Sequence, residues 1–262
     1  MDIQELKAVL ASMGKNPNPA LGQNFFTDAE KLREIAAYLP AGCAVLEVGA
    51  GLGALTRILL ERADSVYAVE KDALLAAWLR DNIKHPKLTV IEGDFLDLPL
   101  PRLPANFLAA GNLPYYVTTP ICERLFSLLP EQLLLMVQSE AGERFFAAPG
   151  SKNYGPIAVL AQLYYSPRRV CALTPANYWP QPQVHSVVIS FEKRADAPAL
   201  PPATLTAFVK TCLAMRRKTL ANNLKAFPNA AQALAACQIS PSARGESLTP
   251  AQFAVLYGQM QG

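Results

Sequence analysis

The sequence predicts an α/β fold, a doubly wound and mostly parallel sheet followed by a small all-helical region. Short apolar segments alternate with longer helical ones, an order typical of parallel strands with helices on both faces. The apolar segments lack alternating polar residues, which indicates strands buried on both faces. After a proline-rich stretch at 195–202 the spacing is helical. We therefore predict one domain at 1–194 and a helical domain at 195–262.

The N-terminal segment 1–14 predicts a short amphipathic helix. Its residues Ile3, Leu6 and Leu10 have helical spacing, and it lacks the basic start of a signal peptide. Thr27 or Asp28 can then cap a helix that runs through Leu39.

The rest of the predicted sheet follows in order. We expect strands at 44–48, 65–70, 88–93, 106–110 and 133–138, with helices at 53–63, 72–84 and 119–129 between them. The segments 168–173 and 184–193 resemble later strands, the second as an antiparallel edge or hairpin. Beyond the proline-rich stretch we expect a helix over 203–227 and a last helix with Thr249 as cap and Pro250 in its first turn.

The composition limits the classes of function. With 51% hydrophobic and 17% charged residues, the chain can form a sizeable core, yet no apolar run approaches the ~18 residues of a membrane span. The 5 cysteines are odd in number and lack CxxC spacing, which indicates a reducing compartment without disulfides or a zinc site. Only 2 histidines are present, which disfavours histidine and metal chemistry. We expect a cytoplasmic monomer with no metal and no membrane contact.

A glycine-rich turn predicts a cofactor site. In 47-EVGAGLGALT-56 the glycines Gly49, Gly51 and Gly53 follow the first apolar strand, where a tight turn lets the backbone approach a ligand. Glu70 ends the next strand and can accept both ribose hydroxyls of a nucleoside. Asp94 ends the third strand and can accept an adenine amine. Together these residues indicate a nucleoside cofactor.

The spacing of the glycines distinguishes two cofactors. A dinucleotide site has GxGxxG, with the pyrophosphate at the helix N-terminus. This chain has GxGxG followed by Ala54, and no Lys or Arg between Val48 and Thr56. A cofactor without phosphate, such as S-adenosyl-L-methionine, fits better than a nicotinamide dinucleotide. The alternative is a tight strand-to-helix connection without a ligand.

The stretch 111-GNLPYYVTTP-120 places an amide, a proline and two tyrosines after an apolar strand. Together with 22-GQNFF-26, the glycine turn, Glu70 and 93-GDF-95, it closely resembles the rRNA adenine dimethyltransferase family. The branch of the family that this chain resembles dimethylates two adjacent adenines near the 3′ end of small-subunit rRNA. The resemblance continues through 138–162, 174–188 and 214–224, and implies a class I methyltransferase domain with a helical C-terminal domain.

The resemblance assigns a role to that stretch. Asn112 Oδ1 and the carbonyl of Leu113 can accept bonds from the adenine amine, while Pro114 fixes the turn. Tyr115 can stack on the base, a contact worth about 1–3 kcal/mol. Tyr178 stands where the family commonly has a phenylalanine on the other face of the base. Tyr116 is left out because many relatives carry a different residue there.

The same resemblance implies further contacts with the cofactor. Asn24 and Phe26 should line its methionine end, although Phe25 and Phe26 are equally consistent with core packing, and the family usually has leucine at Phe26. His185 replaces a usual aspartate and is interpreted as a sheet-edge residue. The cofactor set is Gln23, Asn24, Phe26, Gly49, Gly51, Gly53, Glu70, Lys71, Asp94, Phe95 and Asn112.

Basic residues predict an RNA-binding surface. Several lie in one expected helical region without an intervening acid, and a cluster of this kind can neutralise phosphates; a solvated helix face is the alternative. Segment 142–155 is interpreted as a mobile loop beside the active site. Relatives usually carry several basic residues just before the LGQNF motif, where this chain has only Lys15. The predicted RNA contacts are Arg144, Lys152, Lys210, Arg216, Arg217, Lys218 and Lys225.

The expected function is dimethylation of small-subunit rRNA within an immature 30S particle, with S-adenosyl-L-homocysteine as by-product. One alternative is a large-subunit (23S) rRNA adenine methyltransferase of the macrolide-resistance type, although its motif usually has isoleucine at Leu113. The others are a non-catalytic RNA-binding assembly factor on the same fold and, more distantly, a nicotinamide oxidoreductase.

Overall fold

A computed structural model describes residues 1–17 and 22–261. The chain packs as two compact units. Unit 1 contains Met1–Ile121, Pro130–Ser139 and Arg168–Glu192, and unit 2 contains Cys122–Leu129, Glu140–Pro167 and Lys193–Gly262. The last segment of unit 2 begins near the predicted boundary at 194/195, and two inner segments pack with it. The division of function between 1–194 and 195–262 stays a prediction.

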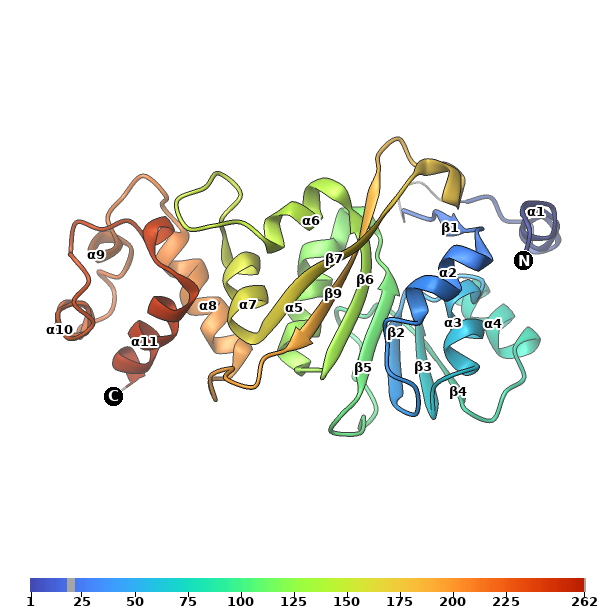
Figure 1. The fold of residues 1–262 in the computed structure, drawn as a ribbon, viewed down its shortest axis with the longest axis horizontal. Helices are drawn as coiled ribbons and strands as arrows, with labels where there is room; N and C mark the ends of the chain where they lie inside the picture. The colour runs from blue at the N-terminus through green and yellow to red at the C-terminus, as the bar shows by residue number, and fades with distance from the viewer. Residues whose placement is uncertain (18–21, 262) are drawn as a thin grey trace. The chain divides into compact units, whose positions relative to one another are not determined.

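The central sheet has, in the described residues, seven strands in the order β4-β3-β2-β5-β6-β9-β7 (Figure 1). Strands β2 to β6 pair in parallel, and β9 runs antiparallel to β6 with Ser186 opposite Gln138. This is the predicted doubly wound arrangement, and it brings the carboxyl ends of the parallel strands to one edge. The strands are β2 Ala44–Val48, β3 Ser65–Glu70, β4 Leu88–Glu92, β5 Leu108–Asn112, β6 Gln132–Gln138, β7 Tyr165–Leu173 and β9 Ser186–Lys193.

Side-chain caps begin three helices of unit 1. Asp2 accepts from Glu5 N at 2.8 Å, Asp28 from Lys31 N at 3.0 Å, and Asp72 from Leu74 N at 3.1 Å, each satisfying a backbone donor that the first turn leaves open. A small two-stranded sheet pairs β1 Phe25–Phe26 with β8 Tyr178–Trp179. The helices are α1 Ile3–Ser12, α2 Ala29–Ala36, α3 Ala54–Leu60 and α4 Ala73–Asn82.

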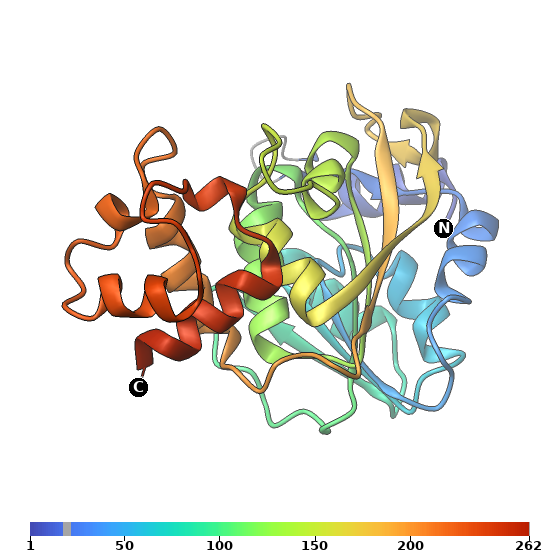
Figure 2. The ribbon, with the colours of Figure 1, turned by 60° about the vertical axis from the view of Figure 1, so that its left-hand side comes forward.

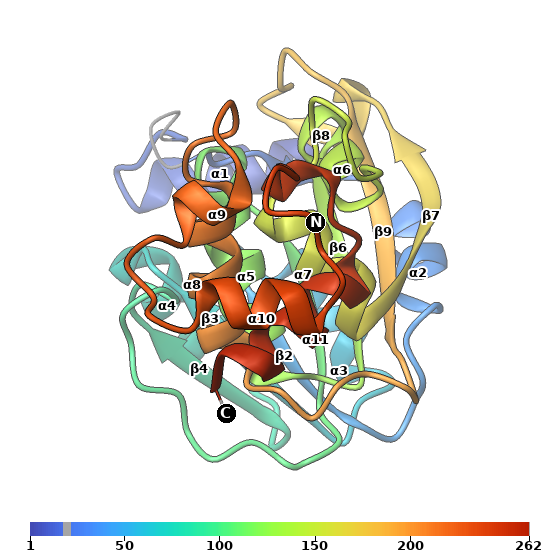
Figure 3. The same ribbon diagram turned by 90° about the vertical axis from the view of Figure 1, so that its left-hand side faces the viewer.

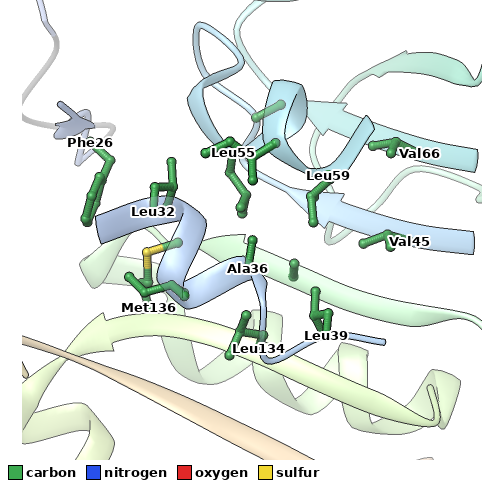
Figure 4. Close-up of a cluster of buried hydrophobic side chains, with 14 of the residues drawn as sticks. Phe26, Leu32, Ala36, Leu39, Val45, Leu55, Leu59, Val66, Leu134 and Met136 are labelled. Atoms are coloured by element: carbon green, nitrogen blue, oxygen red, sulfur yellow. The ribbon is translucent and has the colours of Figure 1, made fainter. Parts of the chain in front are cut away.

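The core of unit 1 lies between the sheet and helices α2 and α3 (Figure 4). Leu32 of α2 and Leu59 of α3 pack over Val45, Val66 and Leu134 of the strands, and each is at most 2% exposed. Each Å² of apolar surface that such packing removes from water stabilises the fold by about 25 cal/mol. The packing fixes the strand ends that carry the predicted cofactor residues.

Unit 2 is mostly helical, and its helices α7, α8 and α11 pack on one another (Figures 2 and 3). The expected single helix over 203–227 is wrong, because α8 ends at Leu213 and α9 begins only at Leu220. Asn223 Nδ2 donates to Cys212 O at 2.8 Å, which holds a carbonyl at the end of α8. The helices are α5 Thr118–Leu128 and α6 Ser139–Phe145, which both begin in unit 1, and α7 Pro156–Tyr164, α8 Pro202–Leu213, α9 Leu220–Asn223, α10 Ala230–Ala236 and α11 Pro250–Gln261.

Two kinds of feature are absent from residues 1–17 and 22–261. No helix in these ranges combines the length and apolar character needed to cross a membrane. No group of three or more His, Cys, Asp or Glu residues in the same ranges could hold a metal ion.

Candidate active site

A cavity opens at the carboxyl edge of the sheet in unit 1. It is lined by the glycine turn after β2, by the end of β3, by the segment after β4 and by the end of β5. This is the edge at which open α/β sheets bind their ligands. The predicted cofactor residues that line it are Gln23, Asn24, Phe26, Gly49, Gly51, Glu70, Lys71, Asp94, Phe95 and Asn112.

The glycine turn has the backbone conformation that its sequence predicts. Gly49, Gly51 and Gly53 have φ of 78°, 57° and 75°, in the left-handed region that favours glycine. Gly53 does not line the cavity but begins α3, where an added Cβ would lie 2.4 Å from Ile83 Cδ1. Gly53 therefore lets the helix pack closely on α4, and Gly49 and Gly51 line the cavity.

The carboxylate of Glu70 is fixed by backbone donors. Its Oε2 accepts from Gly51 N at 2.7 Å and its Oε1 from Asp72 N at 2.8 Å. Burial raises the pKa of Glu70, and these backbone hydrogen bonds oppose the rise. Because a carboxylate oxygen can accept more than one bond, each retains capacity for a ribose hydroxyl.

Asp94 and Lys71 form a charged pair at the cavity, with Lys71 Nζ 2.7 Å from Asp94 Oδ2. The hydrogen bond to Asp94 raises the pKa of Lys71. Asp94 Oδ1 also accepts from Leu96 N at 3.0 Å, which orients the carboxylate. Phe95 is 4% exposed and adds an apolar wall. The charged pair can bind the polar edge of a planar ligand, while Phe95 can pack against the apolar face of that ligand.

The end of β5 presents the predicted acceptor residues. Asn112 Nδ2 donates to the backbone carbonyl of Asn24 at 3.0 Å, so Oδ1 is the amide atom left to accept a bond. Thr118 Oγ1 donates to Pro114 O at 3.1 Å and braces the turn. An added Cβ on Gly49 would lie 3.6 Å from Asn112 O, so the glycine turn and this corner adjoin directly.

The three tyrosines near the end of β5 and in β8 differ in exposure and in the groups that they contact. Tyr116, left out of the sequence-based set, is 53% exposed and lines the cavity, whereas Tyr115 does not. The Tyr115 hydroxyl lies 2.6 Å from Ser186 Oγ. Tyr178 is 1% exposed, and its ring meets Phe26 edge-on at 5.0 Å between centroids. Tyr115 and Tyr178 therefore belong to the same edge but are not walls of the cofactor cavity.

Sequence reasoning missed several cavity residues. Met1 and Leu6 of the N-terminal segment line the cavity, and the Lys15 ammonium is paired with the Asp72 carboxylate. The apolar spacing of segment 1–14 indicated a helix, but not the surface that it covers. Glu47 also lines the cavity, and no sequence pattern separated it from the neighbouring strand residues.

The predicted RNA-binding residues all belong to unit 2 and divide into two groups. Arg216 donates to Glu246 Oε2 at 3.0 Å, to Lys152 O at 2.8 Å and to Ser151 O at 3.1 Å, so its guanidinium holds segment 151–152. Lys210 is paired with Glu123 at 2.7 Å. Among the predicted RNA contacts, those with an exposed side chain and no ion pair to a described residue are Arg144, Lys152, Arg217, Lys218 and Lys225.

Segment 142–155, expected to be a mobile loop, has defined partners. Its first residues belong to α6, Gly150 N donates to Glu246 O at 2.7 Å, and Tyr154 Oη donates to Leu248 O at 2.7 Å. Burial raises the pKa of the Tyr154 phenol. The segment therefore begins in a helix and has hydrogen-bond partners far along the chain, and its mobility stays a prediction.

Comparison with known proteins agrees with this geometry. The profile of the family described as "Ribosomal RNA adenine dimethylase" matches residues 14–261. A Geobacter sulfurreducens protein named "Ribosomal RNA small subunit methyltransferase A" is 40% identical, over 93% of this chain and 95% of its own. A protein of the same name from Streptomyces griseus is 38% identical, over 96% and 92%.

Two solved structures share the fold. A dimethyladenosine transferase from Plasmodium falciparum superposes with a TM-score of 0.72 at 22% identity, covering 88% of this chain and 95% of its own. The 23S rRNA methyltransferase ErmE has a TM-score of 0.62 at 26% identity, covering 91% and 100%. The predicted fold class and family resemblance are both confirmed.

Proposed function

Because the chain belongs to the ribosomal RNA adenine dimethylase family, we propose that it dimethylates the N6 amines of two adjacent adenosines near the 3′ end of small-subunit rRNA. The proposed methyl donor is S-adenosyl-L-methionine, which becomes S-adenosyl-L-homocysteine, and the proposed substrate is an immature 30S particle in the cytoplasm. The main support for this proposal is the shared lining of one cavity. Asn112 and Pro114 line the same cavity as Gly51, Glu70 and Asp94, so acceptors for an amine adjoin a nucleoside site.

The residues of the cavity fit the proposed cofactor. Glu70 is held with capacity for two ribose hydroxyls, and Asp94 can accept the adenine amine beside the apolar face of Phe95. Gly49 and Gly51 line the cavity without a side chain, and the turn from Gly49 to Gly53 carries no cation for a phosphate. When bound, this cofactor supplies an electrophilic methyl group on a sulfonium.

Asn112 and Leu113 would prepare the amine. The lone pair of an adenine amine is delocalised into the ring, which makes the nitrogen a poor nucleophile. Acceptors for its two hydrogens favour the pyramidal form and aim the lone pair. The Asn24 carbonyl fixes the amide of Asn112 through Nδ2, and backbone bonding of Leu113 N to Met136 O at 3.0 Å fixes the neighbouring carbonyl. Positioning of this kind accounts for most of the proposed rate gain.

The target base has to leave its stack to reach this corner. Tyr115 and Tyr178 would then hold its faces, as the family resemblance implies. No general base is required, because the amine becomes acidic as the new N–C bond forms and its proton can pass to water. The cations Arg144, Lys152, Arg217, Lys218 and Lys225 of unit 2 are the proposed phosphate contacts.

The test uses purified ribosomal subunits that lack adenine dimethylation. Each subunit is incubated with the full chain and S-adenosyl-L-methionine labelled in its methyl group. We expect label on adjacent adenosines of the small-subunit rRNA and none on the large subunit. Transfer only to the large subunit would favour the activity named for ErmE. No cofactor binding at millimolar concentration would favour an RNA-binding factor without catalysis.

A further inference from the structure

Ser186 occupies a fixed position at the edge of the active site. It is the first residue of β9, is 1% exposed, and stands opposite Gln138 of β6 in the sheet register. The adjoining backbone bond from Ser139 N to His185 O is 3.0 Å long. The strand therefore leaves the Ser186 hydroxyl little freedom, and this hydroxyl lies 2.6 Å from Tyr115 Oη, within the range of a good O–H···O bond.

The ring of Tyr115 is thereby held at both of its ends. At the backbone end, Thr118 Oγ1 donates to the carbonyls of Pro114 and Tyr115 at 3.1 and 3.3 Å. At the hydroxyl end, Ser186 fixes Oη from a different strand. The backbone bonds alone leave the side-chain torsions of Tyr115 open. Because Oη lies on the long axis of the ring, the bond to Ser186 fixes the direction in which the ring extends from the backbone.

A third hydroxyl lies in the same region. Tyr178 Oη is buried beside the hydroxyls of Ser186 and Tyr115, and among the described residues none meets it with the geometry of a full hydrogen bond. Burial raises the pKa of Tyr178, the nearby Tyr115 raises it further, and Ser186 opposes the rise. The hydroxyls of Tyr115, Ser186 and Tyr178 therefore share one buried polar site beside the acceptor corner.

We propose that Ser186 is a positioning residue for methyl transfer, because its hydroxyl orients the ring of Tyr115 that stacks on the target base. The inference rests on the proposed function. Ser186 acts through Tyr115 and lines no part of the cofactor cavity, so its removal acts on transfer and not on cofactor binding. A single neutral hydrogen bond of this kind corresponds to about a 3- to 10-fold change in rate.

The test compares Ser186→Ala, Tyr115→Phe and the double variant. The single-turnover rate of labelled methyl transfer to undermethylated small subunits is measured at saturating S-adenosyl-L-methionine. Each single variant should lose about 3- to 10-fold, and the double variant should be no slower than the slower single variant, because both changes remove one bond. The dissociation constant of the cofactor should stay within about 2-fold of wild type.

Ser190→Ala is the matched control. Ser190 lies on the same strand, is 4% exposed, and accepts from Gln132 Nε2 at 2.9 Å away from the acceptor corner. This variant should lose stability comparably and keep its transfer rate. A Ser186→Ala rate equal to that of Ser190→Ala, or losses that multiply in the double variant, would overturn the inference. A wild-type chain that methylates no small subunit would overturn the proposed function, and the inference with it.

Discussion

We predict that Glu47, a buried glutamate just before the glycine turn, makes the stability of the fold fall as the pH rises. Glu47 of β2 is 1% exposed, and its Oε2 has no hydrogen-bond partner in the described part of the chain. Burial raises the pKa of Glu47 from 4.5 to about 8, the Glu70 charge adds to the rise, and Thr56 opposes it. The folded protein therefore holds this proton more tightly than the unfolded chain does.

The sign and size of this pH effect on the free energy of unfolding follow from the coupling of proton binding to folding. Because the folded pKa is raised, the contribution to stability is complete below pH 4.5 and is lost as the pH rises to about 8. At about 1.4 kcal/mol per pH unit, the loss over that window is about 5 kcal/mol. Glu47→Gln stays neutral throughout. Its free energy of unfolding, relative to wild type, should rise by up to about 5 kcal/mol across the window and stay level above it.

Urea denaturation of both proteins at several pH values between 4.5 and 9 measures this difference. Thr56→Val is a second variant, because Thr56 lowers the pKa of Glu47 and its loss should move the upper limit of the window to higher pH. Parallel curves for wild type and Glu47→Gln would contradict a raised pKa of Glu47, since they would mean that Glu47 is ionised in the folded protein at neutral pH.

Three further predictions come from residues beside the site and in unit 2. Tyr178→Phe should raise the free energy of unfolding measured in urea by up to about 1 kcal/mol, because its buried hydroxyl has only poorly aligned contacts with Ser186 and Tyr115; a loss of that size would show that these contacts are full hydrogen bonds. The double variant Arg217→Ala, Lys218→Ala should reduce the dependence of RNA affinity on salt concentration. Each exposed cation that contacts a phosphate releases counterions from the RNA, and the variant removes two such cations. Arg216→Ala should change that dependence less and should increase hydrogen exchange in segment 148–155, since its guanidinium binds two carbonyls there. Equal slopes for the two variants would contradict this distinction.

The sequence predicts the strands well because they depend on local patterns, and the residues predicted to bind the cofactor follow from where these strands end. Strands at 44–48 and 65–70 match β2 and β3, and Glu70 lies where the end of a parallel strand has to place it. Asp28 and Asp72 begin their helices as capping residues, which needs only neighbouring donors. These features require no knowledge of distant contacts.

The misses depend on contacts between distant segments. The break after Leu213 is held by Asn223 and by close packing of Gly245, where an added Cβ would lie 2.3 Å from Cys212 O. The charge cluster was interpreted as one RNA surface, but Arg216 is bonded to Glu246 of a later segment. Side-chain partners so far apart in the chain are invisible to periodicity and charge counting.

The role of Asn112 is tested most directly by labelled methyl transfer from S-adenosyl-L-methionine to undermethylated small subunits, with wild type and Asn112→Ala side by side. Loss of an acceptor aimed at the reacting amine should reduce the single-turnover rate by about 100-fold or more. The affinity for the cofactor should change little, because Glu70 and Asp94 stay in place. A rate for Asn112→Ala near that of wild type would contradict the account.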